Sequence, residues 1–543
     1  MLWKAKRVKS NLDNEVDVVV VGAGIAGLYM LYHLLELDLS AKVLEQGGGV
    51  GGTWYWNRYP GARCDVESWD YCYSFSEELN KEWNWSERYP TQPELERYLN
   101  YVTDRFDLRK HIEFNTRVEK ASFDNDHGKW TISTSDEKII QTCYFISAAG
   151  SISENFTPKF KGGKTFLGEQ YHTSRWPQEE VDFSKKRVGV IGTGSSGVQV
   201  IPQVAKAAEH LFVFQRTAQY TVPARNYQLD DEIRDTRKEE FLQRRERKRK
   251  DPVGLTGFPT NPPSAAALDS EIRNQIMEEA WEIGGNRIVR SFNDTLTNRE
   301  SNQHIAKFVR EKIWQRIDDP AVAKVLARMD YPIGARRLVI DIDYFEAYNR
   351  KNVTLVDCKS SSIEEITTNG IRTSDKHYEL DVLIYATGFD GVTGSLLAMN
   401  IEGIDGLSLR KKWEDWPTTY MGLVSSGFPN LFFITGPGSP SVFSNVIALI
   451  EQQVEWIAGC LSYMKKNSFN RIDTNSQLEE QWRKHVQDIA EGFLINEVDS
   501  WWTGSNIPGK SKGIVMYLGG LDVYRELCET SASNGYAGFV FSN

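Results

Sequence analysis

The sequence predicts an α/β protein built around two similar strand–turn–helix units, and two observations carry this prediction. The first is a repeated pattern, Gly-x-Gly-x-x-Gly, which occurs at Gly22, Gly24 and Gly27 and again at Gly192, Gly194 and Gly197. The second is its surroundings: residues 18–21 and 187–191 are apolar runs typical of buried parallel strands, and helical sequence follows each turn. A strand that enters a helix through such a turn is typical of a Rossmann-like dinucleotide-binding unit.

The first unit continues to an acidic residue. Residues 28–37 extend the helix, and residues 41–46 form the next strand, which carries Glu45 about twenty residues after the turn. A carboxylate at this position accepts hydrogen bonds from ribose hydroxyl groups. The first unit therefore suits a nucleotide with an unphosphorylated adenosine ribose, as in FAD or NAD.

The second unit has a basic residue at the equivalent position. A helical run follows Gly197, residues 211–214 form the next strand, and that strand leads into Arg216. A guanidinium group pairs with a 2′-phosphate, so the second unit suits NADP. Two units with complementary end residues favour two bound nucleotides over glycine turns without ligands.

Two further apolar strands indicate how the chain passes between the units. Residues 143–150 and 381–388 both end in glycine and bracket an inserted second domain. Within the insert, apolar residues at helical spacing predict a helical subdomain, and its basic run at 244–250 is expected to be a solvated helix face. The predicted domains are a first nucleotide-binding domain at 1–150 and 389–543, a second with linkers at 151–225 and 331–388, and the helical subdomain at 226–330.

Composition excludes several classes of protein. The chain has 543 residues, with 64 Lys and Arg against 74 Asp and Glu, and a net charge of −10 argues against a nucleic-acid partner. The six cysteines form no Cys-x-x-Cys pair, so we expect no metal site, no redox disulfide and a reducing, cytoplasmic location.

One apolar segment, residues 16–35, superficially resembles a membrane anchor. Three glycines interrupt it and Glu15 and Asp17 lie at its start, so we expect a buried strand and helix and no membrane contact. The alternative, a signal peptide or membrane anchor, is suggested by the basic residues upstream of the segment, which are Lys4, Lys6, Arg7 and Lys9.

Two longer motifs lie beside these units. The first, directly before the second glycine turn, consists of Phe166, Gly168, His172, Trp176 and Pro177 in the spacing F-x-G-x-x-x-H-x-x-x-W-P. The second reads Gly51-Gly52-Thr53-Trp54, then Tyr59-Pro60-Gly61, then Asp65. With both motifs, the sequence resembles the type I Baeyer–Villiger monooxygenases from about residue 16 to 520, nearest the phenylacetone and steroid monooxygenase subgroup.

The resemblance implies an activity. Members of this family use NADPH to reduce FAD, and O2 then gives a C4a-peroxyflavin that attacks a ketone. A Criegee intermediate rearranges to an ester or lactone. The resemblance assigns the catalytic roles to Arg337 and Asp65, and arginine suits the task because it keeps its proton at any working pH.

The resemblance also implies the residues that hold the cofactors. His172 and its motif are expected to have a structural or linking role. Arg336 stands where the family usually has lysine near the 2′-phosphate, and Trp502 leaves open which tryptophan contacts NADP. The expected cofactor-binding residues are Gly22, Ala23, Gly24, Gly27, Glu45, Gly52, Thr53, Trp54, Arg63, Asp65, Tyr71, Gly192, Thr193, Gly194, Ser195, Ser196, Gly197, Arg216, Thr217, Arg336, Arg337, Val446 and Trp501.

The expected substrate is a small ketone. Residues 435–445 resemble the active-site loop of the phenylacetone and steroid subgroup, which implies a pocket lined by Ser441, Val442 and Phe443. Phe443 is bulkier than the usual leucine and is expected to narrow the site. We therefore expect an aryl, cyclic or long-chain ketone and a monomer or weak oligomer. The alternatives are a flavin-containing monooxygenase that oxidises amines or sulfides, and a non-catalytic flavin- and NADP-binding homologue.

Overall fold

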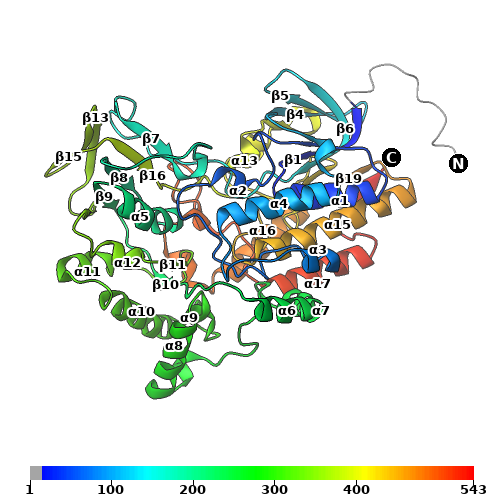
Figure 1. The fold of residues 1–543 in the computed structure, drawn as a ribbon. Helices are drawn as coiled ribbons and strands as arrows, with labels where there is room; N and C mark the ends of the chain where they lie inside the picture. The colour runs from blue at the N-terminus through cyan, green and yellow to red at the C-terminus, as the bar shows by residue number, and fades with distance from the viewer. Residues whose placement is uncertain (1–14) are drawn as a thin grey trace.

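The computed structural model describes residues 15–543, and its largest sheet contains β1, the strand that leads into the first glycine turn (Figure 1). The strand order is β17-β4-β5-β6-β1-β2-β3, and β18 pairs with β6. Strand β1 is parallel to both β2 and β6, which confirms the predicted first unit. The strands are β1 (Glu15–Val21), β2 (Ala41–Leu44), β3 (Ile112–Glu113), β4 (Val118–Asp124), β5 (Lys129–Thr134), β6 (Ile139–Ser147), β17 (Ile401–Glu402) and β18 (Leu431–Phe433).

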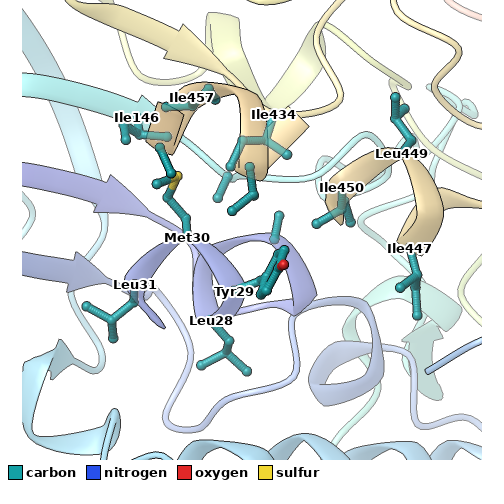
Figure 2. Packing of buried hydrophobic residues seen from close by; sticks show 14 of the residues in the cluster. Leu28, Tyr29, Met30, Leu31, Ile146, Ile434, Ile447, Leu449, Ile450 and Ile457 are labelled. Atoms are coloured by element: carbon teal, nitrogen blue, oxygen red, sulfur yellow. The ribbon is translucent and has the colours of Figure 1, made fainter. Parts of the chain in front are cut away.

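Two long helices cover one face of this sheet. Helix α1 (Ile25–Glu36) follows the glycine turn and packs against α15 (Val446–Asn467). Figure 2 shows Met30 of α1 packed near Ile146 of β6 and Ile457 of α15, all of which are fully buried. The hydrophobic core beside this sheet therefore includes residues from the C-terminal part of the chain.

A second sheet, in which all strands are parallel, contains β8, the strand that leads into the second glycine turn. Its order is β12-β9-β8-β16-β7, with every pair parallel. Strand β8 has the predicted bounds, and α5 (Ser195–Ala207) follows the turn. The strands are β7 (Glu169–His172), β8 (Arg187–Ile191), β9 (His210–Gln215), β12 (Val353–Asp357) and β16 (Val382–Tyr385). Two Rossmann-like sheets in one chain confirm the predicted fold class.

The helices between residues 226 and 330 pack on both domains. Figure 1 shows α6 and α7 beside α3 and α17 of the first domain, whereas α8 to α11 lie below the second sheet. These helices are α6 (Asp231–Glu239), α7 (Phe241–Lys250), α8 (Ser270–Ile283), α9 (Arg287–Arg290), α10 (Arg299–Trp314) and α11 (Pro320–Leu326).

The basic run on α7 is only partly the solvated face that the sequence predicts, because Arg247 and Lys250 are exposed and two other members are buried. Arg244 and Lys248 are only 6% and 5% exposed, and they donate to the backbone carbonyls of Trp69 and Asp70. Buried basic side chains are stable only when such acceptors satisfy them. These two side chains therefore hold α7 against the backbone of Trp69 and Asp70.

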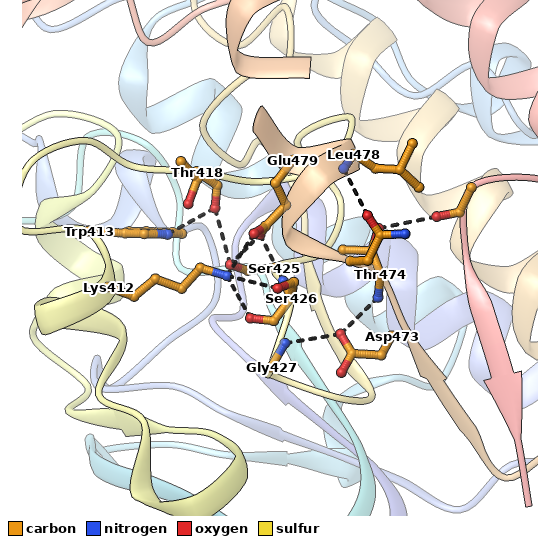
Figure 3. Close-up of polar contacts among 12 residues, drawn as sticks. Lys412, Trp413, Thr418, Ser425, Ser426, Gly427, Asp473, Thr474, Leu478 and Glu479 are labelled. Atoms are coloured by element: carbon orange, nitrogen blue, oxygen red, sulfur yellow. Dashed lines mark hydrogen bonds and ion pairs between the residues drawn. The ribbon is translucent and has the colours of Figure 1, made fainter. Parts of the chain in front are cut away.

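Helix α16 (Ser476–Ala490) is held to the first domain by a buried ion pair (Figure 3). The Glu479 carboxylate lies 2.8 Å from Lys412 Nζ and accepts from Ser425 Oγ and Ser426 N. Glu479 is 2% exposed, so these donors compensate its loss of water. The pair fixes the start of the segment that leads to Trp501.

The remaining elements connect these parts. The helices are α2 (Thr53–Trp56), α3 (Glu77–Glu82), α4 (Gln92–Arg105), α12 (Tyr344–Ala347), α13 (Gly394–Leu397), α14 (Leu409–Lys412) and α17 (Leu521–Ser533). The small sheets are β10 (Thr221–Pro223) with β11 (Val339–Asp341), β13 (Ile363–Thr367) with β14 (Gly370–Thr373) and β15 (His377–Glu379), and β19 (Arg471–Asp473) with β20 (Val540–Ser542). Among residues 15–543, no helix is long and apolar enough to cross a membrane. The basic residues Lys4, Lys6, Arg7 and Lys9 lie outside this range.

Candidate active site

Both glycine turns open on the same cavity, which has a volume of about 1150 Å³. The carboxyl ends of β1 and β8 reach it through Gly22 and Gly192. Ligands of open α/β sheets bind at these strand ends. One cavity can therefore hold two nucleotides close together.

The first turn requires glycine for geometric reasons. Gly22 has a φ of +104°, and a Cβ there would lie 2.6 Å from the Ala148 carbonyl oxygen. A Cβ on Gly27 would lie 1.8 Å from the Gly22 carbonyl oxygen, because helix α1 begins directly against the turn. Gly24 and Gly52 also touch, since a Cβ on Gly52 would meet the Gly24 Cα at 2.9 Å. The backbone thus forms a smooth cradle at the start of α1, where N–H groups favour phosphate.

Glu45 fastens this cradle. Its carboxylate accepts from Ala23 N at 2.8 Å and from Gly47 N at 2.7 Å. Burial raises the pKa of Glu45, and these two backbone donors oppose that rise. A carboxylate has about four acceptor sites, so it retains capacity for ribose hydroxyl groups. Its chemistry fits the unphosphorylated adenosine ribose of FAD.

The second turn repeats this geometry. Gly192 has a φ of +107°, and a Cβ on Gly197 would lie 2.3 Å from the Gly192 carbonyl oxygen. In contrast, a Cβ on Gly194 would meet no atom within 4 Å, so its backbone faces open cavity. Arg216 and Thr217 line the same cavity beyond the turn. This end of the cavity therefore has both a phosphate cradle and a cationic side chain, that of Arg216.

Arg336 is a second cation at this end. Its Nη2 donates to the Asp499 carbonyl at 2.7 Å, whereas its buried Nε has no hydrogen-bond partner in the protein. A buried guanidinium N–H without an acceptor is costly. Arg336 thus has a donor available for a phosphate oxygen, which fits the 2′-phosphate of NADP.

An ion pair lies between the two nucleotide cradles. Arg337 donates from Nε and Nη2 to the two carboxylate oxygens of Asp65, at 2.7 and 2.5 Å. Asp65 raises the pKa of Arg337 further above its ordinary value. The third nitrogen, Nη1, lies 3.5 Å from the Val442 carbonyl oxygen. About a third of the Arg337 side-chain surface is exposed, and this residue lines the cavity.

Two aromatic residues form the wall beside Asp65. Trp54 Nε1 donates to the Tyr71 hydroxyl at 3.2 Å, and both rings are less than 10% exposed. Burial raises the pKa of Tyr71, so its hydroxyl stays protonated at neutral pH. The wall is therefore uncharged, and Arg337 and Asp65 provide the charge at this point.

Most of the predicted cofactor residues line the cavity. Ala23, Gly27 and Gly197 instead shape the two turns from behind. The residues that line the cavity are Gly22, Gly24, Glu45, Gly52, Thr53, Trp54, Arg63, Asp65, Tyr71, Gly192, Thr193, Gly194, Ser195, Ser196, Arg216, Thr217, Arg336, Arg337, Val446 and Trp501.

The two adjacent tryptophans have different environments. Trp501 lines the cavity and packs against Gly391, where a Cβ would lie 2.7 Å from its ring. Trp502 is 5% exposed and belongs to the second core. The geometry therefore favours Trp501 as the residue beside NADP.

The substrate loop differs from its expected arrangement. Of the three residues, only Val442 lines the cavity. Ser441 is 1% exposed and its hydroxyl faces Ser151 Oγ at 2.8 Å. Phe443 packs edge-on against Phe493 with ring centroids 6.3 Å apart. Phe443 does not line the cavity, and the expectation that it narrows the site stays a prediction. Val442 beside it has a left-handed backbone with a φ of 58°.

The fingerprint residues lie behind the cavity. Phe166 and Trp176 are each 6% exposed, and a Cβ on Gly168 would lie 2.3 Å from the Asp381 carbonyl oxygen. His172 accepts from Ser174 N through Nδ1, and its Nε2 lies 3.3 Å from both the Phe156 carbonyl and Thr387 Oγ1. Burial lowers the pKa of His172. None of the fingerprint residues, Pro177 included, lines the cavity.

Sequence reasoning missed several cavity residues. Gln199 accepts from the Tyr59 hydroxyl at 2.8 Å and donates to the Arg63 carbonyl at 3.0 Å, which joins the two domains. Asn445 caps helix α15 by accepting from Ile447 N at 3.1 Å. An asparagine directly before a long apolar run is a capping signal that could have identified the second of these. Gln199 has no such local signal.

The comparisons with known proteins agree with this geometry. The flavin-binding monooxygenase-like family model matches residues 15–244. A protein of Pseudooceanicola batsensis named Baeyer–Villiger monooxygenase is 39% identical over 97% of this chain and 96% of its own length. The chain belongs to the Baeyer–Villiger monooxygenase family. Another member, acetone monooxygenase (methyl acetate-forming) of a Gordonia species, is 39% identical over 97% of this chain and 99% of its own length.

A solved structure of a family member has the same fold over nearly the whole chain. This is oxidised steroid monooxygenase bound to NADP, which is 46% identical, with a TM-score of 0.93. The match covers 97% of this chain and 99% of that one. This agreement confirms the predicted α/β fold. It covers both nucleotide-binding domains of the Baeyer–Villiger monooxygenase fold.

Proposed function

We propose that this protein is an NADPH-dependent flavoprotein that inserts one oxygen atom beside a ketone carbonyl. The overall reaction is ketone + NADPH + H⁺ + O2 → ester or lactone + NADP⁺ + H2O. When bound, FAD supplies the oxygen-transfer chemistry, with NADPH as its reductant. The observation that carries the proposal is the Arg337–Asp65 ion pair, which lies in one cavity with both nucleotide cradles.

We assign Arg337 the role of a fixed cation. Oxygenation of a carbonyl develops negative charge on oxygen, and a preorganised guanidinium group stabilises such charge. Arg337 keeps its proton at working pH, so it stabilises an anion without donating a proton to it. Asp65 is assigned the positioning of this group, because its two oxygens fix two of the three guanidinium nitrogens.

The cofactor assignments follow the two turns. Glu45 and the first turn are proposed to hold FAD, and the second turn with Arg216, Thr217 and Arg336 is proposed to hold NADPH. The complementary charges of Glu45 and Arg216 support this order. The proposed domains keep the boundaries 1–150 with 389–543 for FAD, 151–225 with 331–388 for NADP, and 226–330 for the helices.

The proposed substrate is an aryl, cyclic or long-chain ketone. Val446 and Ile450, one helical turn apart on α15, present apolar surface to the cavity, as does Val442. Such a lining favours a mainly apolar molecule that has one polar group. We also propose a cytoplasmic monomer or weak oligomer, and the six free cysteines support a reducing location.

A ketone panel with product analysis tests the proposal. The FAD-loaded enzyme is incubated with NADPH, O2 and aryl, cyclic or long-chain ketones, and esters are identified by mass spectrometry. Labelled O2 should place one labelled oxygen in the ester. Matched amines and sulfides form the second arm, and products from these alone would support the N- or S-oxidising alternative. NADPH consumption without any oxygenated product would contradict both activities.

A further inference from the structure

Three buried hydroxyl groups join a connector between the nucleotide domains to the loop beside Arg337. Ser151 Oγ donates to Thr435 Oγ1 at 3.1 Å and lies 2.8 Å from Ser441 Oγ. All three residues are at most 8% exposed, and buried hydroxyl groups are normally hydrogen-bonded. Ser151 follows β6, whereas Thr435 and Ser441 lie between β18 and α15.

The residue after Ser441 has a strained backbone that faces Arg337. Val442 has a φ of 58°, a left-handed conformation that is a true outlier for a β-branched side chain. Its carbonyl lies 3.5 Å from Arg337 Nη1, the nitrogen that Asp65 does not bind. Strain of about 1–3 kcal/mol persists only where the surroundings hold it. The hydroxyl contacts of Ser441 provide such a restraint directly beside it.

Ser151 also touches the connector that returns from the second domain. Its carbonyl accepts from Val392 N at 2.7 Å, and the neighbouring Gly150 carbonyl accepts from Ser395 Oγ at 2.9 Å. Ser151 is therefore fixed by both connectors. Its side chain contacts Ser441 and so restrains the loop that contains Val442.

We propose that Ser151 is a positioning residue for oxygenation, which acts through the hydroxyl of Ser441 to keep the Val442 carbonyl against Arg337. This inference rests on the proposed function. A guanidinium group held on all three nitrogens stays aligned with the reacting oxygen. When it is displaced, a larger share of the NADPH is consumed in the competing reaction NADPH + H⁺ + O2 → NADP⁺ + H2O2, which leaves the ketone unoxygenated.

The test compares Ser151→Ala, Ser441→Ala and the double variant in the FAD-loaded enzyme. Hydrogen peroxide and ester are measured per NADPH consumed. A typical hydrogen bond stabilises a folded arrangement by about 0.5–1.5 kcal/mol. Loss of this bond in each single variant should therefore raise the peroxide-to-ester ratio about 2- to 10-fold. Because both hydroxyls act through one contact, the double variant should match the single variants.

Ser291→Ala is the matched control. It removes another buried serine hydroxyl, which donates to the Arg287 carbonyl in the helical region away from the cavity. It should change thermal stability by a similar amount and leave the peroxide-to-ester ratio unchanged. If Ser151→Ala does not fold, Ser441→Ala tests the same contact from the other side.

Two results would overturn the inference. One is a wild-type ratio in Ser151→Ala or Ser441→Ala, and the other is a double variant whose effect is the product of the two single effects. Failure of the proposed function is distinguishable, because the wild-type enzyme itself would then make no ester from any ketone. A double-mutant cycle on thermal unfolding measures the Ser151–Ser441 contact without any substrate and should give a non-additive result.

Discussion

Replacing Asp65 with asparagine measures how much the orientation of Arg337 contributes to oxygenation. Asp65 accepts from Nε at 2.7 Å and from Nη2 at 2.5 Å, whereas asparagine keeps one acceptor and turns an N–H2 group toward the other donor. A hydrogen bond to a charged group contributes about 1.5–3 kcal/mol. A barrier raised by that amount slows ester formation about 10- to 150-fold, because each 1.36 kcal/mol is a factor of ten.

The assay separates flavin reduction from oxygenation. Without O2, NADPH should bleach the flavin of Asp65→Asn at close to the wild-type rate, because the second glycine turn and Arg216 are unchanged. With O2 and ketone, the variant should release more hydrogen peroxide per NADPH and less ester. Arg337 stays protonated in both proteins, so loss of charge cannot explain the difference. Ester formation at the wild-type rate would refute the role assigned to Asp65.

Three other substitutions test separate parts of the molecule. Arg216→Ala should weaken NADPH binding about 10- to 150-fold and leave NADH binding unchanged, and an unchanged NADPH preference in titrations would contradict the 2′-phosphate assignment. Trp501→Ala should weaken NADP binding with little change in stability, whereas Trp502→Ala should cost about 3–5 kcal/mol of unfolding free energy, since Trp502 is 5% exposed in the core. Burial raises the pKa of Asp473 to about 6, so its carboxyl group binds a proton more tightly in the folded protein than in the unfolded chain. The free energy of unfolding should therefore fall by about 3 kcal/mol from about pH 4 to above about pH 6. Asp473→Asn keeps the Oδ1 acceptor for Gly427 N and Thr474 N. The variant should abolish this fall in denaturant titrations. A wild-type pH profile in the variant would mean that another group causes the fall.

The two nucleotide units could be predicted because their requirements are local. Gly22 and Gly192 need a positive φ, and Gly27 and Gly197 need room for a carbonyl five residues earlier in the chain. Glu45 and Arg216 follow at a distance set by one helix and one strand. Each requirement acts within a short stretch, so residue spacing alone is sufficient to find it.

Other features depend on contacts between distant segments. Arg244 on α7 donates to the carbonyl of Trp69, which lies in a different part of the sequence. Nothing near Arg244 distinguishes it from the exposed basic residues beside it, so its burial could not be predicted. Ser441 likewise does not line the cavity, and its hydroxyl contacts Ser151, which is distant in sequence. Composition and spacing predict neither contact, because each joins residues that lie far apart in the sequence.

The charged centre of the cavity depends on the same packing. Arg337 lies in the segment assigned to the second nucleotide domain, whereas its carboxylate partner Asp65 and the Val442 carbonyl come from the two parts assigned to the first. A rotation between the domains would therefore separate the guanidinium group from its partners without breaking any contact inside either domain. Ser151 lies on the connector and touches the loop of Val442, so it links the relative position of the domains to the alignment of Arg337. It follows that substitutions at Ser151 or Asp65 should alter the partition between ester and hydrogen peroxide more than the rate at which NADPH reduces the flavin.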